Sequence, residues 1–298
     1  TAPVRPLLHG GRGSDAAHSG PRPPPRLSQA VPSVEGHTAM LTTDFPIGSP
    51  CWIDLGSPDI PATAAFYSTV FGWTFLEIPD TGGYGFVQLN GKTVGAIGSL
   101  NEGDPSTWTT YFRSSDADAT ANAVRQAGGK VLVEPMDVMQ EGRLAQFSDP
   151  QGARFAVWQS GNTKGLDAVS EEGALVWAEL HTSDQDGAFA FYRQLFGWRV
   201  ENFEPSPGMT YRVLSTAEGD QRDTSFGGIA PTMSPEQPSA WTPYFAAEDV
   251  DAVIARATAA GGSVLMPAAD VENVGRLAWL ADPNGAPFAL IKGEPQES

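Results

Sequence analysis

Two carboxylates and one histidine have residue types and positions suited to acid–base chemistry. They are Asp54, Glu179 and His181, and His181 is the one histidine beyond the first 39 residues. A carboxylate held in an apolar pocket has a raised pKa and can act as a general base or bind a cationic or hydroxylated ligand. Structural roles compete with this prediction: Asp54 or Glu179 can pair with an arginine such as Arg113, and a lone histidine is often a core group.

Strand periodicity decides which neighbours share a face with these residues. Cys51–Leu55 alternates, so Trp52 and Asp54 point to one side while the intervening residues point to the other. Trp177, Glu179 and His181 repeat this alternation. Because Cys51 lies on the opposite face with no histidine near it, we expect no Cys–His nucleophile.

A second group of residues has the side chains to hydrogen-bond or stack against a ligand. Its members are Trp52, Thr109, Tyr111, Arg113, Trp158, Trp177, Thr242, Tyr244 and Trp279. Thr109, Tyr111 and Arg113 alternate along one predicted strand, and Thr242 with Tyr244 repeats the first two. For several of these aromatic residues, packing in the core is the competing role.

An internal repeat indicates the architecture that positions these residues. A shift of 125 residues aligns Trp52–Trp73 with Trp177–Trp198, sharing Phe-Tyr and Phe-Gly-Trp. A shift of 133 aligns Trp108–Phe155 with Trp241–Phe288, where 23 of 48 positions are identical. The second copy therefore carries eight extra residues, which we expect at a hairpin tip over 217–225. We predict domains over 45–160 and 172–294, joined by a linker over 161–171.

Each copy reads twice as a strand, a helix and three short strands. The first helix is predicted over 61–71, ending at Gly72, and the second over 116–127, ending at Gly128. Glycine and asparagine turns separate the following strands. The fold class is therefore α+β, with two βαβββ units in each domain. Asp137 with Arg143 and Asp270 with Arg276 are predicted to be structural ion pairs.

These motifs resemble the vicinal oxygen chelate superfamily of glyoxalases, bleomycin-resistance proteins and extradiol dioxygenases. The resemblance rests on the Asp, Phe-Tyr and Phe-Gly-Trp pattern and on Asp-Pro-x-Gly before the last strand, in both copies. It looks most like bacterial two-domain members labelled glyoxalase-like or hydroxylase. The resemblance implies that two βαβββ units pair into a cup-shaped sheet, with the ligand inside the cup.

The superfamily's usual reaction needs a divalent metal held by His, Gln or Glu. Carried over by position, the ligand positions fall on residues that cannot bind such a metal well. They are Trp52, Thr109 and Ala156 in the first copy, and Trp177, Thr242 and Ala289 in the second. We therefore predict no metal and no other cofactor, unless the alignment is displaced by a residue or two.

Composition restricts the partners. The formal charge is −17, from 18 Lys+Arg and 35 Asp+Glu, which disfavours nucleic acid and anionic membranes. Apolar runs stay short of the roughly 18 residues that span a bilayer, and one cysteine excludes an intramolecular disulfide. We expect a cytoplasmic protein, either a monomer with internally paired domains or a homodimer. Residues 1–39 are proline-rich and are expected to be a disordered extension before Met40.

The leading prediction is a metal-free protein that binds a small aromatic or polyoxygenated molecule in its cups, sequestering or presenting it. The alternative is a glyoxalase-like lyase, hydroxylase or dioxygenase. It would be either metal-free, with Asp54, Glu179 or His181 as acid or base, or metal-dependent. A scaffold without a ligand is the third class.

Overall fold

The computed structural model describes residues 41–100, 103–206, 209–271 and 274–293. The extension predicted over 1–39 lies outside these residues. The first copy contains β1 (Pro50–Ser57), α1 (Ile60–Phe71), β2 (Thr74–Glu77), β3 (Gly85–Leu89), β4 (Lys92–Ser99), β5 (Thr107–Arg113), α2 (Ala117–Gln126), β6 (Lys130–Val138), β7 (Gly142–Ser148) and β8 (Arg154–Ser160). The second contains β9 (Leu175–Thr182), α3 (Gln185–Phe196), β10 (Arg199–Ser206), β11 (Met209–Ser215), β12 (Ser225–Pro231), β13 (Ala240–Ala246), α4 (Val250–Ala259), β14 (Ser263–Val271), β15 (Gly275–Ala281) and β16 (Pro287–Gly293).

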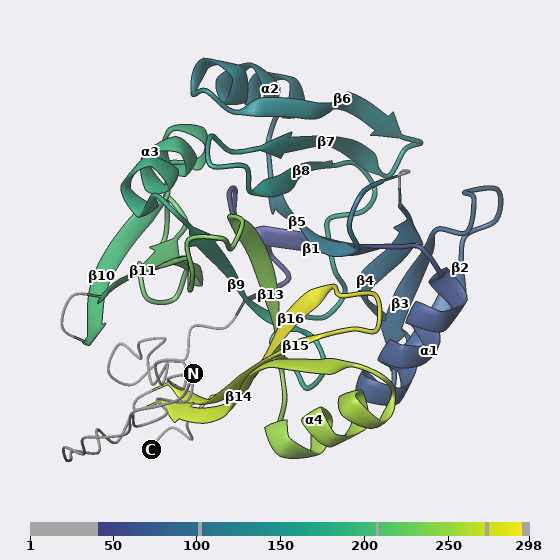
Figure 1. The fold of residues 1–298 in the computed structure, drawn as a ribbon. Coiled ribbons are helices and arrows are strands. Elements are labelled where there is room, and N and C mark those ends of the chain that lie inside the picture. The colour runs from purple at the N-terminus through teal and green to yellow at the C-terminus, as the bar shows by residue number, and fades with distance from the viewer. Residues whose placement is uncertain (1–40, 101–102, 207–208, 272–273, 294–298) are drawn as a thin grey trace, which may run out of the picture.

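Each copy forms one eight-stranded mixed sheet. The first has the order β2-β3-β4-β1-β5-β8-β7-β6, and the second repeats it as β10-β11-β12-β9-β13-β16-β15-β14. The first strands of the two units, β1 and β5, pair antiparallel at the centre, and each also pairs in parallel with the last strand of its own unit. This arrangement confirms the predicted α+β class with tandem βαβββ units. The two curved sheets and their flanking helices are seen in Figure 1.

The helices begin and end where the sequence signals lie. An aspartate caps each N-terminus, and Asp59 accepts from the Ala62 amide at 3.0 Å. Gly72 and Gly197 end α1 and α3 with φ of 76° and 69°, a left-handed conformation that glycine adopts without a steric penalty. Among the described residues, no helix combines the length and apolar character needed to cross a bilayer.

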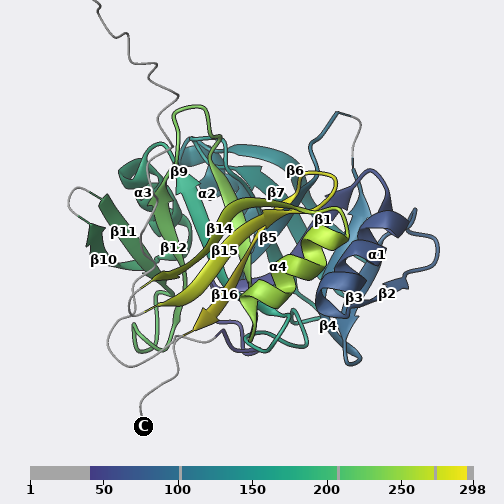
Figure 2. The ribbon, with the colours of Figure 1, turned by 60° about the horizontal axis from the view of Figure 1, so that its bottom comes forward.

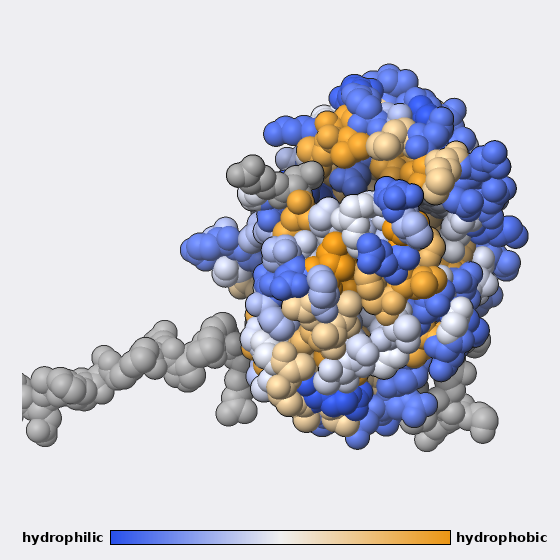
Figure 3. All heavy atoms as spheres, turned by 90° about the vertical axis from the view of Figure 1, so that its right-hand side faces the viewer, coloured by the Kyte–Doolittle hydropathy of each residue, from blue (hydrophilic) through white to orange (hydrophobic). Residues whose placement is uncertain are grey.

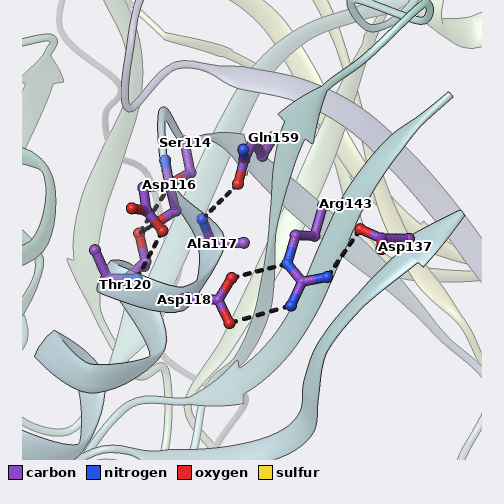
Figure 4. Close-up of polar contacts among 9 residues, drawn as sticks. Ser114, Asp116, Ala117, Asp118, Thr120, Asp137, Arg143 and Gln159 are labelled. Carbon is purple, nitrogen blue, oxygen red and sulfur yellow. Dashed lines mark hydrogen bonds and ion pairs between the residues drawn. The ribbon is translucent and has the colours of Figure 1, made fainter. Parts of the chain in front are cut away.

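An arginine clamp joins α2 to the β6–β7 hairpin (Figure 4). Arg143 donates to Asp137 at 2.8 Å, as predicted, and also forms a bidentate pair with Asp118 on α2, at 2.9 and 3.1 Å. Arg276 makes the matching pairs with Asp270 and Asp251. The predicted structural role of both arginines is therefore confirmed, and both stand apart from the cups.

The repeated aromatic motifs form the boundary between the two copies. Phe71 of α1 packs 5.1 Å from Phe245 of β13, and Phe112 of β5 packs 5.0 Å from Trp198. Helix α1 also contacts α4, and the two lie side by side in Figure 2. The Phe-Tyr and Phe-Gly-Trp motifs therefore hold the copies back to back, which leaves the opposite face of each sheet to form a cup.

The eight extra residues of the second copy are distributed over three connections. The pair Ser215–Ser225 in the second copy is equivalent to the pair Gln88–Thr93 in the first. Ser225 follows Ser215 by ten positions and Thr93 follows Gln88 by five, so five of the eight extra residues lie between β11 and β12. The expectation of a single insertion at 217–225 is thus only partly correct. The others lie between β10 and β11 and between β12 and β13, where a short insertion does not disturb strand pairing.

Candidate functional site

The first sheet encloses a cavity of about 410 Å³. Volumes of this size suit small organic ligands. The cavity lies over the face of β1 that carries Trp52 and Asp54, and both units of the first copy contribute to it. Cys51, Ile53 and Leu55 are completely buried, as the predicted alternation requires.

The floor of the cavity is polar. Tyr111 of β5 donates its hydroxyl to Asp54 at 2.7 Å, and the amide of Gln146 on β7 donates to the Tyr111 hydroxyl at 3.4 Å. Burial raises the Asp54 pKa to about 6, although hydrogen bonds from Tyr111 and Thr109 partly offset this. A carboxyl group that titrates near neutrality can accept a proton or a hydrogen bond from a ligand.

The walls of the cavity are aromatic. The rings of Trp52 and Phe86 meet edge to face with centroids 5.5 Å apart, and Tyr84 packs 6.4 Å from Phe86. Trp158 closes another side, with its indole nitrogen fixed by the Thr163 carbonyl at 2.9 Å. Since the indole nitrogen of Trp158 is already hydrogen-bonded, its ring and those of Trp52 and Phe86 present aromatic surface suited to a flat apolar ligand.

The mouth of the cavity combines apolar and charged groups. Leu132 and Met139, on the β6–β7 hairpin, line the cavity while remaining 45% and 77% exposed. Across the mouth, Arg154 forms an ion pair with Asp104 at 3.0 Å. On the face drawn in Figure 3, apolar patches lie among polar surface. The mouth therefore allows access and offers apolar contact before a ligand reaches the floor.

The second cup has a comparable polar floor, but its own side chains cover it. Glu179 is 3% exposed and accepts from the hydroxyls of Tyr211 and Tyr244 at 2.8 and 2.7 Å. His181 Nε2 lies 3.5 Å from Glu179, and burial lowers the His181 pKa. The Trp279 indole donates to Tyr244 at 2.8 Å and packs against the His181 ring. The Glu179 carboxylate is thus hydrogen-bonded within the protein.

The predicted site residues divide between these two places. Those of the first copy that line the cavity are Trp52, Asp54, Thr109, Tyr111 and Trp158. Arg113 is not among the lining residues, and it acts electrostatically on the buried Cys51, whose pKa burial raises to about 12. In the second copy the structure brings together Trp177, Glu179, His181, Tyr244 and Trp279, with Thr242 buried beside Glu179 on β13.

Tyr84, Phe86 and Gln146 line the cavity but were not predicted from the sequence. Tyr84 corresponds to Tyr211, since Phe86 pairs with Ala96 as Val213 pairs with Gly228, but the local shift is 127 rather than 125. The Gln146 position did carry a signal, because the 133-residue shift aligns Gln146 with Trp279 inside an otherwise similar block.

A divalent metal does not fit the side chains at the expected ligand positions of the first cup. Ala156 occupies one expected ligand position and is completely buried, while Trp52 and Thr109 occupy two others. Across the described residues, no group of three or more His, Cys, Asp or Glu could hold a metal ion. Indole and methyl groups supply no donor electron pair, so we derive no step through a metal.

The family model described as the glyoxalase/bleomycin resistance protein/dioxygenase superfamily matches the chain twice, over residues 51–157 and 174–290. The chain belongs to this superfamily. Both matches coincide with the two cup-forming copies, so the resemblance drawn from the repeated motifs is confirmed.

Several relatives align along nearly their whole length. The chain is 38% identical over 262 residues to the "Putative glyoxylase CFP32" of Mycobacterium tuberculosis, covering 86% of this chain and 98% of the relative. It is 37% identical over 267 residues to the anthracycline biosynthesis protein DnrV of Streptomyces peucetius, covering 84% and 95%. This chain therefore aligns with nearly the whole length of both relatives.

Solved structures share the fold at low identity. A 2,2′,3-trihydroxybiphenyl 1,2-dioxygenase from Sphingomonas wittichii superposes with a TM-score of 0.58 and 14% identity, covering 84% of this chain and 92% of that one. The Mn(II)-bound glyoxalase from Novosphingobium aromaticivorans superposes with a TM-score of 0.54 and 19% identity, and the superposition covers 85% of each chain. At such identities the likeness extends to the fold alone.

Proposed function

We propose that the first cup binds a small, flat, hydroxylated aromatic molecule without a metal, and that the protein sequesters or presents this molecule. The observation that carries the proposal is the cavity of about 410 Å³ with aromatic walls over the Asp54–Tyr111 pair. A ring system between Trp52 and Trp158 would gain apolar contact, while a hydroxyl at the floor would donate to Asp54.

The names of relatives support an aromatic ligand. Proteins 37% identical to this chain are named for anthracycline biosynthesis, and anthracyclines are fused polycyclic aromatic molecules that carry hydroxyl groups. Binding without chemistry accords with a floor whose carboxylate is paired to a tyrosine and lacks metal-binding neighbours among the described side chains.

The test uses 1,8-dihydroxyanthraquinone as a probe, titrated into the protein while tryptophan fluorescence is followed. We expect saturable quenching, weakened at least about tenfold by Trp52→Ala, which corresponds to about 1.4 kcal/mol. Trp177→Ala, at the matching position of the second copy, is the control and should leave the affinity unchanged. Absence of saturable binding, or equal loss in both variants, would contradict the proposal.

A metal-free enzyme is the second candidate, and the Asp54 pKa of about 6 favours it. A carboxylate with this pKa is poised to remove a proton from a ligand hydroxyl or an activated carbon near neutral pH. Turnover of a bound compound, with a pH–rate profile whose acid limb disappears in Asp54→Asn, would support this candidate over simple binding.

A further inference from the structure

The two cups share a carboxylate hydrogen-bonded to a tyrosine at matching floor positions. Asp54 and Glu179 occupy matching positions on β1 and β9, and each accepts a hydrogen bond from a tyrosine of the next unit, Tyr111 or Tyr244. Trp177 donates to Tyr211 at 3.0 Å, and Trp52 and Tyr84 occupy the matching positions of the first cup. The carboxylate–tyrosine pair at the floor of the second cup thus matches that of the first.

Several lining positions differ between the two cups. At the walls the first copy has the larger residues, Phe86 against Val213 and Trp158 against Ile291, whereas at two positions beside the carboxylate the second copy has the larger ones. Strand register aligns Gly56 with His181, because each lies two residues beyond the floor carboxylate. It also aligns Gln146 with Trp279, which pair with Ala156 and Ala289 on the last strands. At both positions the second copy has an aromatic ring where the first has glycine or glutamine, so the space beside the carboxylate that is open in the first cup is occupied in the second.

The rings of His181 and Trp279 pack on each other beside the Glu179 carboxylate. The His181 and Trp279 ring centroids lie 4.5 Å apart, edge to face, and the two residues are 6% and 5% exposed. The buried Nδ1 of His181 has no hydrogen-bond partner within the described part of the chain. Burying a nitrogen without a hydrogen-bond partner costs free energy, so the position of His181 is stabilised by its packing against Trp279 and not by hydrogen bonds from Nδ1.

We infer that the second cup is a copy of the ligand site closed by His181 and Trp279, so each chain binds one ligand, in its first cup. This inference rests on the proposed function. It also identifies Gly56 and Gln146 as the residues that keep the first cup open, because their small or flexible side chains leave the floor accessible. Replacing the two rings by their first-cup counterparts should then open a second site.

The experiment measures the number of 1,8-dihydroxyanthraquinone molecules bound per chain by equilibrium dialysis. We expect about one equivalent for the wild type and two for the double variant His181→Gly, Trp279→Gln. Trp241→Phe, which alters another buried tryptophan at the boundary between the copies, is the control and should bind one. Two equivalents for the wild type, or one for a folded double variant, would overturn the inference.

The reciprocal variant keeps the test decisive if the double variant does not fold. Gln146→Trp places the tryptophan of the second cup at the matching position of the first cup. This variant should no longer bind the one molecule of 1,8-dihydroxyanthraquinone that the wild type binds, while its circular dichroism and melting temperature remain close to those of the wild type. Gly56→His is not used, because a Cβ at Gly56 would lie 2.5 Å from Leu100 Cδ2. Retention of the equivalent in Gln146→Trp would place the ligand elsewhere and overturn the inference.

Xenon binding separates failure of this inference from failure of the proposed function. Xenon enters apolar cavities without regard to hydroxyl chemistry. In crystals under xenon pressure, the wild type should take up xenon in the first cup, and Trp279→Leu should also do so in the second. If the probe fails to bind but xenon follows this pattern, the proposed ligand is wrong and the closed cup stands. Xenon in the wild-type second cup would overturn the inference itself.

Discussion

The indole nitrogen of Trp198 donates to the carbonyl oxygen of Gly48 at 2.9 Å across the boundary between the copies. Trp73 donates to Gly173 at the same distance, and Gly48 and Gly173 are separated by the 125 residues that separate the repeats. The two bonds are therefore equivalents under a local two-fold relationship. Each joins the Phe-Gly-Trp motif of one copy to the segment that precedes the first strand of the other.

Removing either bond should destabilise the protein by a similar amount. Trp198→Phe and Trp73→Phe leave a buried carbonyl without its donor and delete part of a packed ring, a change that costs about 1–3 kcal/mol in unfolding free energy. Urea denaturation measures it. Thr69→Ala, which removes an exposed hydroxyl bonded to Ala65, is the control and should stay within about 0.5 kcal/mol of wild type. A large loss in one tryptophan variant and none in the other would contradict the equivalence.

The architecture was predictable from the sequence because the same strand, helix-cap and turn signals recur at a nearly fixed spacing. Apolar alternation, capping aspartates and helix-ending glycines such as Gly72 are local signals, and their repetition indicated four βαβββ units. The face of β1 was predictable for the same reason: Trp52 and Asp54 lie two positions apart, and both line the cavity.

The difference between the cups was not predictable by the same means. It depends on which residues of β7 and β15 lie above the carboxylates, and this requires the register of strands far apart in the sequence. From the sequence, Glu179 looked as suitable for chemistry as Asp54, and His181 was a further candidate. The packing of Trp279 on His181 beside Glu179 closes the second cup, and periodicity gives the face of a strand but not the volume above it.

Asp54 should make the protein less stable as the pH rises. Its pKa in the folded state, about 6, lies above the ordinary value near 3.9, so between these values the folded protein binds more protons than the unfolded chain. This destabilisation is complete above about pH 6 and absent below about pH 4. We therefore expect Asp54→Asn to raise the unfolding free energy at pH 7.5 by about 1–2 kcal/mol, and to change it little at pH 4.

Asp118 provides a control of opposite sign, measured by urea denaturation at pH 7.5 and at a pH below the ordinary pKa of aspartate. Hydrogen bonds from Arg143 lower the Asp118 pKa, so its contribution to stability is present at neutral pH and is lost on acidification. Asp118→Asn should therefore destabilise the protein at pH 7.5 and lose this effect at low pH. If Asp54→Asn behaves like Asp118→Asn, the Asp54 carboxyl is not desolvated in the way the cavity floor requires.

Substitution of Glu179 should lower stability without affecting ligand binding, whereas substitution of Asp54 should weaken ligand binding. Glu179→Gln leaves the Tyr211 and Tyr244 hydroxyls facing an amide, and should cost about 1–3 kcal/mol in unfolding free energy while leaving the affinity for 1,8-dihydroxyanthraquinone unchanged. Asp54→Asn should weaken that affinity several-fold, because it removes the charged acceptor. Dialysis and urea denaturation on both variants supply the comparison. A loss of affinity in Glu179→Gln as large as that in Asp54→Asn would contradict this assignment.

His181 should contribute a pH dependence of the reverse sign to that of Asp54. Burial beneath Trp279 lowers its pKa, and the Glu179 carboxylate only partly offsets this, so below about pH 6.5 the unfolded chain takes up a proton that the folded protein resists. Stability is therefore lost on acidification through this range, and the unfolding free energy of His181→Gln should fall less than that of wild type between pH 7 and pH 5. Because burial is the main cause, the difference should persist in 1 M NaCl, which weakens only the exposed ion pairs. A pH-independent difference between the two proteins would show that His181 is not held neutral in the closed cup.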